Sequence, residues 1–97
     1  MKKTATHRAR RKPRRLSEKL LRIRESLQLT QEEMARRFED YVKQKHISSF
    51  ETGEREPDLL VLIRYAEIAN ICLDILVNDK YDLPEKIPGL YRHLPKE

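Results

Sequence analysis

The chain has 97 residues and a formal net charge of +5 at pH 7, with 38% hydrophobic residues, 38% charged residues, two glycines and no tryptophan. This length allows one small domain, and the scarcity of glycine favours helices over a turn-rich β-sandwich. A single cysteine excludes an internal disulfide and fits a reducing compartment. No apolar run approaches the roughly 18 residues that span a bilayer, and the cationic N-terminus lacks the apolar region of a signal peptide. We therefore expect a cytoplasmic protein without a membrane partner.

The positive charge is concentrated at the N-terminus. Eight of the 21 Lys and Arg lie in residues 1–15, which hold no acid. Residues 16–97 hold the other 13 together with all 16 acids. A block of like charge this dense cannot fold alone and is typical of tails that bind nucleic acids. The sequence thus predicts a basic flexible arm over residues 1–15, with a solvated tail that binds nothing as the alternative. The candidate phosphate contacts within the arm are Arg10, Arg11 and Arg14.

Helical periodicity begins directly after the arm. Apolar residues recur there at spacings of four, three and four, namely Leu16, Leu20, Ile23 and Leu27. This pattern predicts a first helix over about residues 17–28, with Lys19 on one of its other, polar faces. Thr30 and Glu33 then have the spacing of a capping box, in which each side chain accepts a hydrogen bond from the other residue's backbone N–H. They predict a short second helix that ends near Phe38 or Glu39.

The next two helices are bounded by capping residues. A connector, EDYVK, precedes a third helix predicted over about residues 44–52, with Gly53 at the left-handed position that ends it. Asp58 is expected to cap a fourth helix that ends at Ala69, and Asn70 suits its left-handed end. The inward side chains expected in these two helices are Ile47, Phe50, Leu59, Leu62, Ile63, Ala66 and Ile68.

The last segment combines a short helix with a proline-containing tail. ICLDILVND predicts a fifth helix with Cys72 as a small core hydrophobe and three further buried residues, Leu73, Leu76 and Val77. The tail contains Pro84, Pro88 and Pro95, which exclude a long helix. Its acidic residues are expected to be solvated: Asp79, Asp82 and Glu85. Its apolar residues are expected to cover the groove between the first and fifth helices or to pack on a second subunit, with a mobile tail as the alternative: Leu83, Ile87, Leu90, Tyr91 and Leu94.

The order of these motifs resembles a known family. From residue 16 to about residue 78 the chain is similar to the Cro/repressor-type helix-turn-helix domain of the XRE family. The matching features are the TQEEMA opening of the second helix, the ISSFETG motif of the third, the proline of the following loop and the LDIL ending of the fifth. The resemblance implies an all-α, five-helix lambda-repressor-like domain over residues 16–78, preceded by the basic arm 1–15 and followed by an irregular tail, 79–97.

The resemblance also implies which residues contact DNA. The major groove, about 12 Å wide, admits one helix, and the third helix takes this place in the family. Three of its residues are then expected to face base edges: Gln44, Lys45 and Ser49. Gln31 resembles the family's phosphate-contacting glutamine at the start of the second helix. Lys43 and Arg55 flank the third helix and are expected to contact phosphates as cations. The alternative for each of these residues is an ordinary solvated side chain.

Two further features concern the framework. Glu51 resembles the family's buried acid, and Arg24 resembles its partner on the first helix; an unpaired buried carboxylate would cost several kcal/mol, so we expect the two to form a structural pair. The connector before the third helix is about two residues longer than is typical and lacks glycine. Either the second helix extends into it, or Tyr41 and Val42 pack as a lid, with core packing favoured for Tyr41 over a phosphate contact.

No enzymatic chemistry is indicated. His7, His46 and His93 are scattered, no Cys/His cluster has zinc spacing, and no glycine-rich phosphate loop is present. We expect no catalytic residue, no metal and no cofactor. The prediction is a sequence-specific regulator of transcription, acting as a repressor, that binds double-stranded DNA as a homodimer. The alternatives are an antitoxin or accessory protein that binds a protein partner through its C-terminal tail, and a non-specific RNA-binding interaction module.

Overall fold

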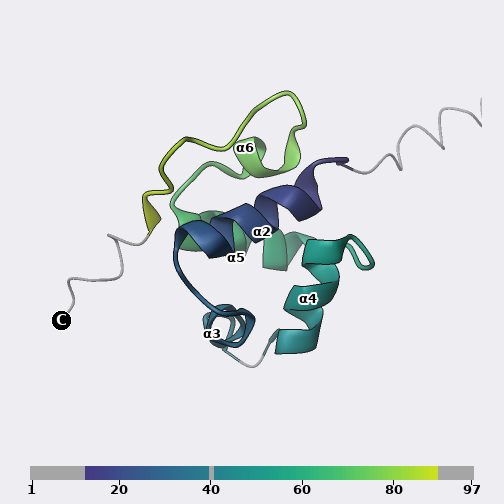
Figure 1. The fold of residues 1–97 in the computed structure, drawn as a ribbon. Helices are drawn as coiled ribbons and strands as arrows, with labels where there is room; N and C mark the ends of the chain where they lie inside the picture. The colour runs from purple at the N-terminus through teal and green to yellow at the C-terminus, as the bar shows by residue number, and fades with distance from the viewer. Residues whose placement is uncertain (1–12, 40, 90–97) are drawn as a thin grey trace, which may run out of the picture.

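The computed structural model describes residues 13–39 and 41–89 (Figure 1). These residues contain no strand and form five helices, α2 (Leu16–Ser26), α3 (Gln31–Arg36), α4 (Gln44–Thr52), α5 (Leu59–Ala69) and α6 (Leu73–Val77). The all-α prediction is therefore confirmed. No helix in the described ranges is long and apolar enough to cross a membrane.

The helices pack in an arrangement that leaves α4 at one side of the domain. α2 packs against both α4 and α6, α3 packs against α4, and α5 packs against α6. In Figure 1, α6 lies at one end, α3 and α4 lie at the other, and α2 and α5 cross between them. The most deeply buried side chains come from all five helices: Leu20, Ile23, Met34, Ile47, Tyr65 and Leu76. One continuous core thus fixes the position of α4.

The caps expected at four helix ends are confirmed, although α2 and α3 end two or three residues before their expected ends. Thr30 Oγ1 accepts from the Glu33 N–H at 3.0 Å, and Glu33 Oε1 accepts from the Thr30 N–H at 2.8 Å, which completes the capping box. Asp58 Oδ1 caps α5 by accepting from the Val61 N–H at 3.0 Å. Gly53 ends α4 with φ = 85° and Asn70 ends α5 with φ = 59°, both in the left-handed region.

The inward face of α5 differs from the prediction. Leu59 is 61% exposed and Ile63 is also exposed, whereas Tyr65 is completely buried. Tyr65 packs against Phe38 with 5.2 Å between ring centroids, and burial raises the pKa of its hydroxyl. Because α5 begins at a surface loop, its first turn projects past the core, and the buried stripe starts only at Val61.

The connector between α3 and α4 is as long as the sequence indicates, but α3 does not extend into it. α3 ends at Arg36, and Glu39 adopts φ = 49° in place of the glycine that such turns favour. Val42 is buried and packs as expected. Tyr41 is 52% exposed, and its hydroxyl lies 3.2 Å from Asp58 Oδ2, so the expected core packing of this residue is wrong.

Lys19 is the largest departure from the expected pattern. It was expected on a polar face, but it is 2% exposed. Its Nζ donates to the carbonyl oxygens of Ile75 at 2.8 Å, Asn78 at 3.0 Å and Tyr81 at 2.8 Å. Burial lowers the pKa of Lys19, and the neighbouring Arg15 charge lowers it further. The three carbonyls act in the opposite direction, because they satisfy all three donors of the ammonium group.

The segment after α6 is held against the start of α2. We call residues 78–82 the strap. Asp79 accepts from the backbone N–H groups of Arg14 at 2.8 Å and Arg15 at 3.0 Å, and Arg15 donates to Asp82 Oδ1 at 2.6 Å. Asp79 is half-buried, so the expectation that it is solvated is wrong, whereas Asp82 and Glu85 are exposed as expected. Cys72, expected in the core, is exposed just before α6.

The tail beyond the strap contributes to the core. Leu83 is buried with the core residues, and Ile87 is half-buried against them. These two residues cover the domain, as one of the two expected roles of the tail requires. Leu90, Tyr91 and Leu94 lie outside the described residues.

Replacing Asp79 with asparagine should make the stability of the domain depend less on pH in acid solution. The two backbone N–H groups lower the pKa of the Asp79 carboxyl, so the folded state binds its proton less readily than the unfolded state does. The stabilisation is present above the unfolded pKa and is lost as the pH falls through the folded pKa. Between about pH 5 and pH 2, the free energy of unfolding should therefore fall less steeply in Asp79→Asn than in the wild type. Urea unfolding followed by circular dichroism at each pH measures this slope.

The control for this variant is Glu85→Gln, which removes the same charge from an exposed side chain beyond the strap. Equal slopes in the two variants would show that Asp79 does not stabilise the fold through its charge.

Candidate nucleic-acid interface

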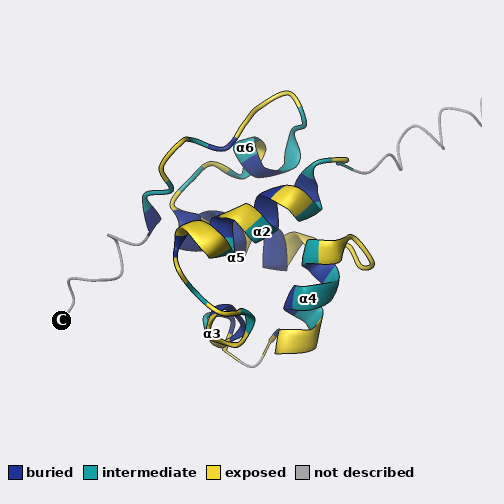
Figure 2. Ribbon diagram, in the orientation of Figure 1, coloured by how far each residue is buried: buried dark blue, intermediate teal, exposed yellow. Residues whose placement is uncertain are grey.

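α4 has one face in the core and one face in solvent. Ile47 and Phe50 are buried, which fixes the helix to the domain. Gln44 and Lys45 are exposed and Ser49 is half-buried, so the three residues expected to face bases lie outside the core. Figure 2 shows the first turn of α4 as exposed and its middle as buried or half-buried. The exposed turn therefore lies in solvent at one side of the domain.

The start of α4 is held by a residue that sequence reasoning left out of the site. His46 Nδ1 accepts from the Lys43 N–H at 3.0 Å, which satisfies a free donor at the helix N-terminus. His46 stands at the third helical position, where Glu or Gln occupies a capping box, and this spacing was the signal that could have identified it. Lys43, Gln44 and Lys45 are all exposed and form the leading edge of α4.

A buried carboxylate near the C-terminal end of α4 joins three helices. Glu51 Oε2 accepts from Arg24 Nε at 2.7 Å, and Glu51 Oε1 accepts from Arg24 Nη2 at 3.0 Å. The Glu51 side chain is 5% exposed, and its hydrogen bond to Arg24 raises the pKa of the guanidinium. The structure thus brings together the two residues that were expected to pair. We call Arg24, Gln31 and Glu51 the carboxylate hub.

Gln31 is the third member of the hub. Its Nε2 donates to Glu51 Oε1 at 3.0 Å, so its amide links α3 to α4. Arg24 Nη1 also donates to the Leu29 carbonyl at 2.9 Å, which attaches the loop before α3 to α2. These bonds orient α3 and α4 relative to each other and to α2. This bond uses one N–H of the Gln31 amide within the domain, and the phosphate contact expected of Gln31 stays a prediction.

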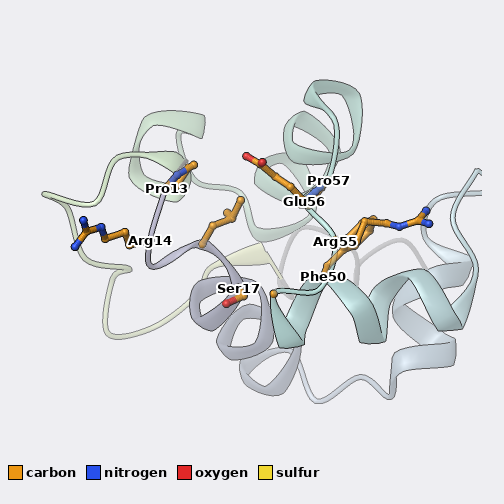
Figure 3. Close-up of a pocket in the computed structure, with 9 residues that line it drawn as sticks. Pro13, Arg14, Ser17, Phe50, Arg55, Glu56 and Pro57 are labelled. Atoms are coloured by element: carbon orange, nitrogen blue, oxygen red, sulfur yellow. The ribbon is translucent and has the colours of Figure 1, made fainter. Parts of the chain in front are cut away.

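Arg55 lies in an exposed loop that folds back on α4. Its backbone N–H donates to the Ser49 carbonyl at 3.2 Å, and its neighbours Glu54 and Glu56 are exposed. A pocket of about 170 Å³ separates this loop from the start of α2. Figure 3 shows Pro13 and Arg14 on one side of the pocket, with Arg55 and Pro57 on the other.

The expected cations of the arm have different positions. Arg14 is exposed at the rim of this pocket. Arg10 and Arg11 lie outside the described residues. Arg15 was counted with the arm, but its guanidinium donates to Asp82 and to the Asp79 carbonyl, so it belongs to the framework. Within the described ranges, no group of three or more His, Cys, Asp or Glu residues is placed to hold a metal ion.

Two short helices in succession, the first packed against the second and the second exposed along one edge, have the arrangement of a helix-turn-helix motif. The family model described as Helix-turn-helix matches residues 20–76, more than half of the chain. The chain therefore belongs to the helix-turn-helix family, in the Cro/repressor or XRE class that its motifs resemble, with α3 and α4 as the two helices of the motif. No curated protein and no solved structure matches the chain. The family is one of DNA-binding proteins and not of enzymes.

Proposed function

We propose that the protein is a sequence-specific regulator of transcription that represses by occupying its operator. The observation that supports this proposal best is the exposed leading edge of α4, formed by Lys43, Gln44 and Lys45, on a helix that Ile47, Phe50 and the carboxylate hub fix to the domain. Recognition of base edges requires side chains that are free in solvent and a backbone that does not move on binding. The exposure of the α4 edge supports the first, and the hub bonds with the packing of Ile47 and Phe50 support the second.

The contacts follow from the chemistry of each side chain. Gln44 pairs with adenine through two hydrogen bonds, Lys45 donates to guanine O6 and N7, and the Ser49 hydroxyl accepts or donates at either. The residues around α4 contact phosphates and so fix its register: Gln31, Lys43, Arg55, Arg14, Arg10 and Arg11. The rest of the arm adds affinity that does not depend on sequence, or enters the adjacent minor groove.

A domain of this size buries little surface on DNA, so the operator complex is proposed to be a symmetric homodimer on a palindromic site. Leu59 and Leu60 are 61% and 63% exposed at the start of α5, next to the loop that follows α4. This exposed apolar turn supports association between two copies. The two α4 helices of such a dimer would contact half-sites about 34 Å apart.

The described part of the tail offers little support for the antitoxin alternative. A tail that binds a partner protein needs accessible apolar side chains. Leu83, however, is buried in this domain's own core, and Ile87 is half-buried against that core. The RNA-binding alternative depends on the arm alone and leaves the exposed edge of α4 without a role. Competition between RNA and duplex DNA at matched salt distinguishes it from the proposed function.

Selection from a random duplex library at near-physiological salt tests the proposed function. The expected result is an enriched inverted repeat, because a twofold dimer presents two identical α4 helices. Lys45→Ala should relax the preference at one position of each half-site, at a cost of about 1–3 kcal/mol in discrimination. Lys80→Ala, at an exposed lysine in the strap, is the matched control and should leave the motif unchanged. A library with no enriched motif would overturn specific recognition by α4.

Neutralising the arm should have a different effect from changing α4. The six Lys and Arg between residues 2 and 12 are to be replaced by glutamine in the full chain, which leaves Arg14 and Arg15 intact. Affinity should fall for all sequences alike, and the slope of log K against log salt should become less negative by up to about 5, because fewer counterions are released. Fluorescence anisotropy over a range of salt concentrations measures both quantities. A selective loss for the operator would instead place the arm in base recognition.

A further inference from the structure

The arm leaves the domain through a short segment that is hydrogen-bonded on one side and lines a pocket on the other. We call residues 13–15 the arm root. On one side, Asp79 Oδ2 and Oδ1 accept from the backbone N–H groups of Arg14 and Arg15 at 2.8 and 3.0 Å. The Arg15 guanidinium donates back to the Asp79 carbonyl at 3.0 Å and to Asp82 Oδ1 at 2.6 Å. Both the backbone and the side chain of the root are therefore attached to the strap.

The strap is itself fixed to the domain. Lys19 Nζ donates to the Asn78 and Tyr81 carbonyls at 3.0 and 2.8 Å, so a buried cation lies within the turn. Asn78 Oδ1 accepts from the Lys80 N–H at 3.0 Å, and Leu83 enters the core directly after the strap. In Figure 1 the loop after α6 passes beside the beginning of α2. A segment attached to α2 at Asn78 and Tyr81 and followed by a core residue can hold the root in one direction.

The other side of the root faces the DNA-binding elements. Pro13 and Arg14 line the pocket of about 170 Å³ opposite Gly53 and Arg55 (Figure 3). Gly53 ends α4, and Arg55 is a proposed phosphate contact. The chain thus passes into the arm beside the C-terminal end of α4. Seven of the eight bases of residues 1–15 precede Arg15, whose own charge is paired with the strap.

We propose that the strap is a positioning device for the basic arm, and that Asp79 and Asp82 are its positioning residues. They hold the root so that the arm meets the phosphates that flank the C-terminal end of α4. Without them, the arm would start from many directions, and ordering it on DNA would cost more conformational entropy. This inference rests on the proposed function, since it assigns the arm to DNA.

The proposal predicts that removing these two acids weakens DNA binding, whereas their charge alone predicts the opposite. Asp79 and Asp82 are acids in a protein that binds a polyanion, so their removal should strengthen binding if charge alone mattered. A positioning role predicts weaker binding. A merely structural role at the start of α2 predicts a loss that does not depend on whether the arm carries charge.

The experiment measures the affinity of full-length Asp79→Ala and Asp82→Ala for a duplex of random sequence and for the selected operator. Each substitution is made in the wild-type chain and in the chain whose six arm bases are replaced by glutamine. Fluorescence anisotropy is recorded at one salt concentration and at a temperature where circular dichroism shows every variant to be folded. Asp79→Ala should weaken binding about fivefold or more with the charged arm, the lower range of coupling between sites. With the neutralised arm it should cause no loss.

Glu85→Ala is the matched control, because it removes an exposed acid beyond the strap. It should leave affinity unchanged or slightly increased in both chains. An equal loss for Asp79→Ala with and without arm charge, or a gain with the charged arm, would overturn the positioning role while leaving the proposed function intact. If the wild-type chain binds no duplex, the proposed function fails and the strap proposal fails with it.

Discussion

Replacing Arg24 with methionine should lower the free energy of unfolding by about 3–5 kcal/mol, because it leaves a buried charge without its partner. The Glu51 side chain is 5% exposed, and Arg24 provides two of the three hydrogen bonds that it accepts. Gln31 alone cannot balance the carboxylate, since a neutral amide brings no opposite charge. Urea unfolding of the full chain, followed by circular dichroism, measures the loss.

Three further variants test whether the loss of stability comes from the unpaired charge. Arg24→Met with Glu51→Met should be more stable than Arg24→Met alone, because the second change removes the orphaned charge. Arg24→Lys should have an intermediate effect, since an ammonium cannot form the two-point contact of a guanidinium. Arg22→Met, at an exposed position of the same helix, should change stability by no more than about 0.5 kcal/mol. If the double variant were less stable than Arg24→Met, the unpaired charge of Glu51 would not be the cause of the lost stability.

Replacing Lys19 with methionine should destabilise the domain by about 2–4 kcal/mol. The methionine keeps the buried volume, but it leaves the carbonyls of Ile75, Asn78 and Tyr81 without their donor. The loss should be smaller than the summed cost of three buried carbonyls without hydrogen bonds, because water can hydrate these carbonyls once the strap loosens. Hydrogen exchange of the strap amides and urea unfolding together separate local opening from global unfolding.

The comparison variant is Lys80→Met, which makes the same chemical change at an exposed position within the strap. Its stability should stay close to that of the wild type. Lys19→Arg should not restore the native stability, since a planar guanidinium does not fit three carbonyls arranged around a single ammonium. Native stability in Lys19→Met would mean that the three hydrogen bonds contribute nothing beyond the burial of the aliphatic stem.

Both predictions connect stability to DNA binding. The carboxylate hub joins α2, α3 and α4, so its loss should reduce operator affinity only as far as it unfolds or loosens the domain. Lys19 acts at a different place, through the strap and the arm root. A variant of Lys19 that remains folded should therefore resemble Asp79→Ala in its dependence on arm charge.

Much of the fold follows from the sequence because its signals are local. The capping box of Thr30 and Glu33, the cap at Asp58 and the left-handed ends at Gly53 and Asn70 each involve residues within a few positions of one another. Local geometry decides whether such hydrogen bonds form, and distant packing changes them little. The bounds of α4, and with them the exposed edge of the candidate interface, could be predicted for the same reason.

Only the tertiary structure determines which distant polar groups contact each helix. Lys19 lies three residues after Leu16 and four before Ile23, so its position on α2 belongs to the apolar stripe, yet its type suggested solvent. Its acceptors lie 56 to 62 residues away, and those of Arg15 in the strap lie up to 67 residues away. Periodicity indicates which side of a helix is inward, but it carries no information on which polar groups meet it there. The arm and its net charge are therefore a property of the sequence, whereas the place where the arm begins is decided by contacts between distant parts of the chain.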